Sequence, residues 1–363
     1  MRGRIYLKGI NGLRAISAIS VVVSHINLSL VQFNLNNLGS IDLAGYGVTI
    51  FFAISGFLIT FLMLKEKEKA NISITKFYIR RVLRIWPLYF LVLILSIVTA
   101  HIYHLGNLPG SLPFYILLAA NIPFIFENAL PFLGHYWSLG VEEQFYLFWP
   151  WIFRNRKNPL KFVVIFTITF FFLRLLFRLI EYKFGYSLPY TIIHVTRFDC
   201  MAIGGIGGIL WHEKNFVFRK ISKHIITQLI SWTVIFLLMF NQYGIASVID
   251  QEIVAIITVF LIINLSFNHK TIISLDYPIF DFLGKISYGM YVIHQLVIFY
   301  FARALNELTI DTIFKYPVIF IGVIGLTILF AYMSYEFFEK WFLKIKERFS
   351  VVKTASTEKD KHE

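Results

Sequence analysis

Long apolar stretches fill most of this chain, and short polar segments separate them. A helix needs about 20 mainly apolar residues to cross the hydrocarbon core of a bilayer. Ten stretches approach that length, and we predict a transmembrane helix in each. They lie at residues 10–30, 43–64, 82–100, 136–153, 161–180, 194–211, 225–242, 251–267, 287–304 and 316–338. The pattern therefore predicts an all-α polytopic membrane protein with about ten transmembrane helices.

One further apolar stretch, residues 112–126, is shorter and contains Pro113 and Pro123. The basic residues decide how to interpret it, because Lys and Arg concentrate in cytoplasmic loops. They gather before the first span, after the second, at 154–161, 214–223 and 270–285, and from 340 onward. All of these segments are cytoplasmic only with ten spans and both termini inside. We therefore predict that 112–126 is a partial or re-entrant segment on the outer side.

Composition limits the remaining possibilities. The chain has 363 residues, of which 57% are hydrophobic, and a formal net charge of +13. In a membrane protein, an excess of positive charge reflects the Lys and Arg residues of cytoplasmic loops. We therefore expect no nucleic-acid partner. A single cysteine excludes an intramolecular disulfide, and the histidines lack zinc-ligand spacing, so we expect no metal site. We predict one membrane domain at 1–345 and a disordered, polar cytoplasmic tail at 346–363.

The first apolar stretch carries two ionisable residues, Arg14 and His25, and no small-residue cleavage site, so we interpret it as a retained helix. Eleven residues are close to three helical turns, so the two side chains differ by about 20° in direction and about 16 Å in height. Ionisable groups inside a membrane helix usually face the bundle interior or a watery cavity. This helix therefore presents a fixed cation and a proton-transfer group along one polar stripe.

A pair of arginines opens the third span. Arg81 and Arg84 are three residues apart and share a helix face. Arginines at a cytoplasmic helix end commonly anchor to lipid phosphate, which is the structural interpretation. Forked guanidinium groups also suit the phosphates of a nucleotide-bearing donor, which is the functional one.

Two adjacent carboxylates, Glu142 and Glu143, lie in an apolar, aromatic helix. Their directions diverge by about 100°, so at most one points squarely into a given cavity. Either one completes a buried ion pair with an arginine such as Arg14 or Arg197, or one takes part in the chemistry, and the two carboxylates can divide these tasks.

Other polar residues carry weaker signals. Arg197 and Asp199 either line an outer cavity or pair with neighbours, and Arg174, Arg178 and Glu181 have the spacing of a structural network. His294 fits a satisfied core histidine better than a catalyst. The small residues within 47–59 indicate close helix packing.

Taken together, six motifs in order resemble the acyltransferase-3 family of bacterial integral-membrane O-acyltransferases. One departure is near the end, where Glu339 is followed by Lys340 and Trp341 rather than by the family's common Glu-x-Pro. The motifs cover residues 14–294, within a resemblance that runs over about residues 5–341. They are Arg14 with His25; Phe51-Phe52-x-x-Ser55-Gly56-Phe57-Leu58-Ile59; Arg81-x-x-Arg84-Ile85-x-Pro87-x-Tyr89; His135-x-Trp137-Ser138-Leu139-x-Val141-Glu142-Glu143-Gln144-Phe145-Tyr146; Arg197-Phe198-Asp199; and Gly284-Lys285-Ile286-Ser287-Tyr288-x-x-Tyr291-x-x-His294.

The resemblance implies transfer of an acyl group, usually acetyl, from cytoplasmic acyl-CoA to a hydroxyl of an extracytoplasmic or lipid-linked sugar. It implies a multi-pass protein of the bacterial inner membrane, in contact with lipid, with acyl-CoA as co-substrate and no permanently bound cofactor. The family's essential pair maps onto Arg14 and His25, and its CoA-associated motif onto Arg81 and Arg84. The sequence leaves oligomeric state open.

These implications give each residue an expected role. His25 acts as general base or as acyl carrier, and the sequence does not separate the two. Glu142 or Glu143 orients His25 or receives a proton. The residues expected to contact the acceptor are His135, Trp137, Arg197 and Asp199.

A rival function is a polytopic transporter or flippase for a glycan or small anion, which uses the same buried charges without acyl chemistry. The motif series and the lack of an internal sequence repeat favour the enzyme.

Overall fold

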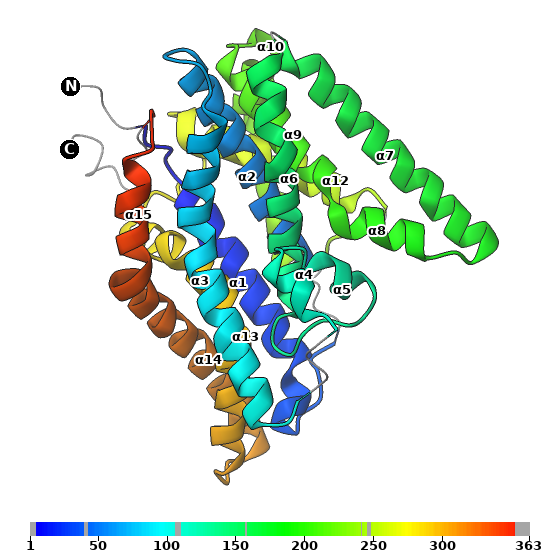
Figure 1. Cartoon of the computed structure of the whole chain (residues 1–363), viewed down its shortest axis with the longest axis vertical. Coiled ribbons are helices and arrows are strands. Elements are labelled where there is room, and N and C mark those ends of the chain that lie inside the picture. The colour runs from blue at the N-terminus through cyan, green and yellow to red at the C-terminus, as the bar shows by residue number, and fades with distance from the viewer. Residues whose placement is uncertain are drawn as a thin grey trace.

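A computed structural model describes residues 5–39, 43–105, 110–156, 158–240, 242–244 and 248–352. These residues form a helical bundle with irregular connections and no extended β-strand (Figure 1). The long helices are α1 (Ile10–Leu28), α2 (Leu43–Lys67), α3 (Ile74–Ile102), α6 (Trp137–Asn155), α7 (Pro159–Phe184), α9 (Phe198–His212), α11 (Ile225–Met239), α12 (Asp250–Phe267), α13 (Pro278–Asn306) and α14 (Thr312–Ser334). The shorter ones are α8 (Leu188–Thr196), α10 (Phe216–Lys223) and α15 (Lys340–Glu347).

Each of the ten predicted stretches overlaps one of these long helices, and the stretch 194–211 also includes the end of α8. Within the described residues, seven helical stretches are long and apolar enough to cross a membrane. An eighth is added if α10 and α11, bent by 59°, count as one span. Helices α1 and α6, which carry the ionisable residues Arg14, His25, Glu142 and Glu143, are not among these candidate spans. The prediction of an all-α polytopic membrane protein is confirmed, and the orientation of the termini stays a prediction.

The segment 112–126 forms two short helices, α4 (Leu112–Ile116) and α5 (Asn121–Ile125). Each has five residues, which is far below the length of a span. Pro113 lies in the first turn of α4, where a missing backbone N–H costs little. Leu118 follows with a φ of 59°, a left-handed conformation that stops a continuous helix. The prediction that this segment is no full span is confirmed.

Helices α2 and α9 pack closely at the centre of the bundle. A Cβ atom added to Gly56 would lie 1.8 Å from the carbonyl oxygen of Met201, and one added to Gly204 would lie 2.2 Å from that of Ala53. Only glycine allows the two backbones to approach this far, as in other membrane helix pairs. The packing predicted for the small residues of α2 is confirmed.

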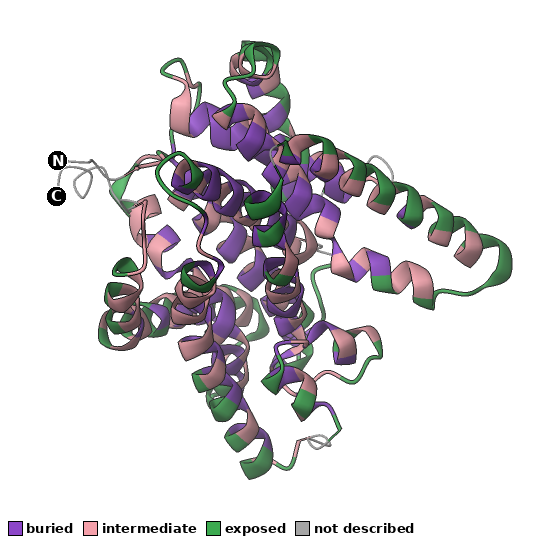
Figure 2. Cartoon of the chain, turned by 45° about the horizontal axis from the view of Figure 1, so that its top comes forward, coloured by how far each residue is buried: buried purple, intermediate pink, exposed green. Residues whose placement is uncertain are grey.

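The buried residues concentrate in the middle of the bundle, whereas α7 and α8 extend away from it as an arm (Figure 2). Helix α1 packs against α2 and α13, so its polar stripe faces other helices. Helices α2 and α3 meet at the end of the bundle where α10 also lies (Figure 1).

Helix α15 follows α14 through a π-helical turn, Tyr335–Glu339, and packs on α3. It ends at Glu347, so the first residues of the predicted tail are helical. Residues 353–363 lie outside the described residues, and the domain boundary at 345 stays a prediction.

Candidate functional site

A cavity of about 360 Å³ opens between α1, α2, α3, α6, α13 and α15. Residues 5–7 and the segment around α15 both line it, so the two ends of the described chain meet at its mouth. Charged residues dominate its polar wall. The basic ones are Arg14, Arg81, Arg84, Lys285 and Lys346, and the acidic ones are Glu142, Glu339 and Glu347.

Most of these cations form no direct ion pair with a described residue. Among the described residues, no carboxylate forms an ion pair with Arg14, Arg81, Arg84 or Lys346. The guanidinium of Arg81 lies 5.5 Å from the ring centroids of both Phe77 and Tyr146, which hold it against the wall. Arginine forks bind phosphate and carboxylate groups bidentately. The cavity therefore suits an anionic ligand.

A second, smaller cavity of about 70 Å³ adjoins the first. The two share Arg81, Arg84 and Lys346, and the smaller one adds Arg80. Arg80 is paired with Glu66 at 3.0 Å, so it is already neutralised. The shared cations can therefore face two anionic groups of one ligand, one in each cavity.

The adjacent carboxylates diverge as their helical spacing predicts. Glu142 lines the large cavity and accepts a hydrogen bond from the Tyr146 hydroxyl at 3.0 Å. That hydroxyl also lies 2.5 Å from Ser55 Oγ on α2. Glu143 turns toward α3 and accepts from Trp86 Nε1 at 3.2 Å. Of these two carboxylates, Glu142 is the one that lines the cavity with the cations.

His25 lies in a group of three histidines rather than in the cavity wall. Its Nδ1 is 2.7 Å from Nε2 of His294 on α13. The ring of His135, which precedes α6, is centred 4.7 Å from that of His294 and 6.2 Å from that of His25. Among the described residues, no three potential ligand side chains form a metal-binding group, these imidazoles included.

Tyr291 and Ser138 connect the cavity to the histidines. Both line the cavity, and their hydroxyl oxygens lie 2.5 Å apart. The Tyr291 hydroxyl also donates to the carbonyl oxygen of His135 at 2.6 Å. His135 is 5% exposed, and neither ring nitrogen has a hydrogen-bond partner among the described residues. The inner end of the cavity is thus one side chain away from the histidine group.

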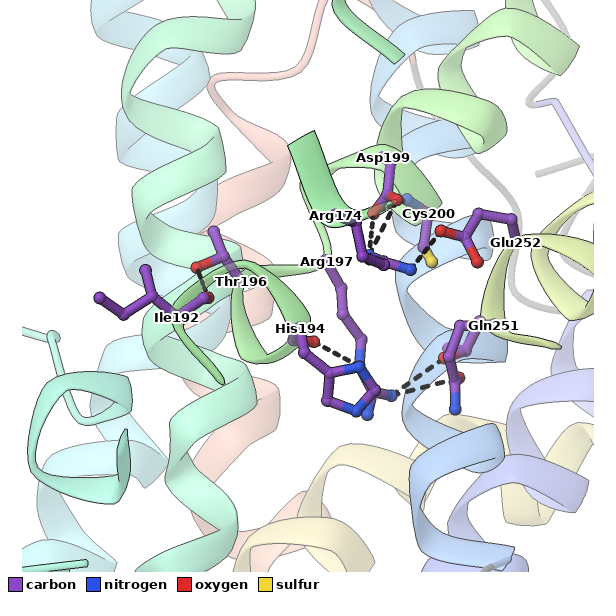
Figure 3. Close-up of polar contacts among 10 residues, drawn as sticks. Arg174, Ile192, His194, Thr196, Arg197, Asp199, Cys200, Gln251 and Glu252 are labelled. Atoms are coloured by element: carbon purple, nitrogen blue, oxygen red, sulfur yellow. Dashed lines mark hydrogen bonds and ion pairs between the residues drawn. The ribbon is translucent and has the colours of Figure 1, made fainter. Parts of the chain in front are cut away.

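Asp199 belongs to a buried ion-pair cluster. Figure 3 shows Arg174 of α7 reaching between Asp199 of α9 and Glu252 of α12. The Arg174 guanidinium is fully buried and lies 2.8 Å from Asp199 Oδ2. Arg174 acts structurally, as its spacing predicts, but its partners are on other helices, whereas Arg178 pairs with Glu181 on its own helix.

Arg197 is held by groups of the protein itself. Its guanidinium donates to the carbonyl oxygens of Gly45 at 2.9 Å and His194 at 3.1 Å, and to Gln251 (Figure 3). It also lies 5.3 Å from the ring centroid of Trp137, which stacks on Phe124. The sequence left two alternatives for Arg197 and Asp199, lining an outer cavity or pairing with neighbours. In the structure, both residues pair with neighbours.

The structure brings three residues from the C-terminal part of the chain to the site. His294 is the partner of His25, although its motif suggested only a core position. Lys346 contributes a cation from the predicted tail. Glu339, the point of departure from the family pattern, lines the cavity and accepts from Ser334 Oγ at 3.1 Å. No local spacing links these residues to the first helix, because they come from the other end of the chain.

A family model described as an acyltransferase domain matches residues 7–336. O-acetyltransferase OatA of Staphylococcus aureus is 27% identical over 92% of this chain and 57% of its own length. Peptidoglycan O-acetyltransferase OatA of Listeria monocytogenes is 34% identical over 44% of this chain and 27% of its own. The chain spans little more than half the length of the curated relatives that match most of it. No solved structure matches.

Proposed function

Because this chain belongs to the acyltransferase domain family, we propose that it transfers an acyl group, most simply acetyl, from acyl-CoA to a sugar hydroxyl. The observation that carries the proposal is the cavity lined by Arg14, Arg81 and Arg84. Arg14 is on α1, and His25 lies on the same helix. One element thereby joins an anion-binding wall to a histidine.

The donor would bind with its phosphates on the shared cations. Coenzyme A carries a diphosphate and a separate 3′-phosphate, and two adjoining cavities share Arg81, Arg84 and Lys346. Two anionic groups on one ligand match that arrangement. The pantetheine arm would then run along the apolar wall past Ser55 and Phe51 toward Ser138. Arg14 and His25 are about 16 Å apart along α1, a distance that a flexible arm of this kind can cover.

The reaction requires His25 to accept a proton and then to release it. The acceptor hydroxyl attacks the thioester carbonyl, a C–O bond forms and the C–S bond breaks. His25 takes the hydroxyl proton as general base and then gives it to the departing CoA thiolate, which leaves as the free thiol. The alternative, in which His25 first carries the acyl group, needs the same ring nitrogen.

The acceptor would approach His25 from the side opposite the cavity. His25 is partly exposed, and His135 beside it has ring nitrogens without a partner among the described residues. A sugar hydroxyl can supply such a partner, so we assign His135 to the acceptor. Because relatives are named O-acetyltransferases, one of them for peptidoglycan, a cell-surface glycan is the acceptor class we propose. The bacterial inner membrane, with the cavity facing the cytoplasm, is the corresponding location.

Donor binding can be tested without knowing the acceptor. Isothermal titration of CoA into the detergent-purified protein should give a dissociation constant that Arg84→Ala weakens about 10- to 100-fold, since a charge-assisted hydrogen bond contributes about 1.5–3 kcal/mol. Arg154→Ala is the matched control, because Arg154 is exposed at the end of α6, away from the cavity. Dephospho-CoA should bind more weakly than CoA. Equal affinity of Arg84→Ala and Arg154→Ala would contradict the proposal.

A further inference from the structure

His294 contacts His25 in a geometry that assigns hydrogen-bond roles. Nε2 of His294 faces Nδ1 of His25 at 2.7 Å. Nδ1 of His294 faces the carbonyl oxygens of Tyr291 at 2.7 Å and Met290 at 3.2 Å, one turn back along α13. Both nitrogens of His294 are therefore engaged, one by backbone and one by His25.

The carbonyl contacts fix the tautomer of His294. A carbonyl oxygen only accepts, so Nδ1 of His294 carries a hydrogen. His294 is fully buried, and a buried imidazolium without a counter-ion is costly. The titratable groups whose rings face it are His25 on α1, His135 before α6 and Tyr291 on its own helix; none is a carboxylate. In the neutral ring, Nε2 of His294 is then the acceptor.

The roles at His25 follow from those at His294. An accepting Nε2 on His294 requires that Nδ1 of His25 donates. In neutral His25 the proton is thus on Nδ1, and Nε2 keeps its lone pair. No hydrogen bond from Nε2 of His25 to a described residue is present, and the side chain is partly exposed. The free lone pair is the atom that a general base or a nucleophile needs.

We propose that His294 is a positioning residue that holds His25 in the tautomer with Nε2 unprotonated and aimed at the reacting groups. This inference rests on the proposed function of His25. When Nε2 takes the hydroxyl proton, the imidazolium keeps its Nδ1–H···Nε2 hydrogen bond to His294. The chain of hydrogen bonds ends on backbone carbonyls, which are poor proton acceptors, so the added proton stays on the histidine pair until it is returned.

Two substitutions separate positioning from mere packing. His294→Phe keeps an aromatic ring of similar size but removes the acceptor. It should lower kcat by about 100-fold, within the range attributed to a positioned base, and leave the KM for acetyl-CoA within about twofold. His294→Gln offers a carboxamide oxygen to Nδ1 of His25 and should restore part of kcat. His101→Phe, at an exposed histidine near the end of α3, is the control and should change neither constant.

The tautomer can be observed directly in the unmodified protein. Nitrogen-15 NMR of histidine-labelled protein, with the His25 signals assigned by difference from His25→Ala, should show a protonated Nδ1 and an unprotonated Nε2. An unprotonated Nδ1 in the neutral ring would overturn the inference, and so would a His294→Phe protein with unchanged kcat. If His25→Ala itself remained fully active, the proposed function would fail instead, so the two failures are distinguishable.

Discussion

His25 and His294 lie 269 positions apart in the chain, yet their ring nitrogens meet at 2.7 Å. The contact joins the first long helix of the bundle to α13. Because Arg14 is on the same face of α1 as His25 and lines the basic cavity, one helix connects the basic wall of that cavity with a histidine pair.

The arginines should affect the donor more than the reaction step. Arg84→Ala should raise the apparent KM for acetyl-CoA about 10- to 100-fold, because it removes a charge-assisted contact to phosphate. Its kcat at saturating donor should fall much less. Steady-state kinetics of the purified protein measure both constants. A fall confined to kcat would place Arg84 in the chemistry rather than in donor binding.

The two carboxylates should respond differently to the same change. Glu142→Gln removes the only one of the pair that faces the arginines, and should lower kcat/KM about tenfold or more. Glu143→Gln keeps an oxygen for Trp86 Nε1 and should stay within about twofold of the unmodified protein. Glu143→Gln serves as the control for Glu142→Gln when both variants are measured in the same assay. The reverse order would show that Glu143 carries the functional role.

The buried ion-pair cluster should matter for stability. Arg174→Ala leaves two buried carboxylates, Asp199 and Glu252, without their cation and should destabilise the fold by about 3–5 kcal/mol. Arg178→Ala breaks a mostly exposed pair with Glu181 and should cost about 0–1 kcal/mol. Denaturant unfolding of the detergent-solubilised proteins measures both. Similar losses for the two variants would contradict the structural role of Arg174.

The close approach of α2 and α9 should not tolerate a side chain. Gly56→Val would place a Cβ atom 1.8 Å from the carbonyl oxygen of Met201, so the helices must separate. We expect a lowered thermal midpoint and loss of folded protein during purification. Gly325→Ala is the matched control, because a Cβ at that helical glycine meets open space. If Gly56→Val were as stable as Gly325→Ala, α2 and α9 could not pack as closely as described.

The sequence predicted the helices well because their signal is local. Apolar length defined each long helix, and the distribution of Lys and Arg between the helices indicated that 112–126 does not span the membrane. Helical spacing also showed that Glu142 and Glu143 diverge. It did not show which one faces the cavity, because that depends on the rotation of α6 against its neighbours.

Residues brought together by the tertiary fold escaped sequence analysis. Buried charge suggested that Asp199 and Arg197 belong to a site. In the structure, Arg174 of α7 neutralises Asp199, and Gln251 of α12 accepts a hydrogen bond from Arg197. His294 is a buried, hydrogen-bonded histidine, as its sequence context predicted, but an isolated histidine in an apolar helix carries no sign of its partner, His25. The shared direction of Arg14 and His25 could be predicted because both are on one helix, and their roles stay a prediction.

The decisive measurement is acyl transfer from acetyl-CoA to a glycan by the purified protein. The detergent-purified protein is incubated with radiolabelled acetyl-CoA and with peptidoglycan fragments or other cell-surface glycans, and label in the glycan is counted. We predict glycan labelling with the unmodified protein and none above background with His25→Ala, which should still bind CoA. Full labelling by His25→Ala would contradict the account. So would accumulation of unmodified glycan in proteoliposomes with no label transfer, which indicates a transporter.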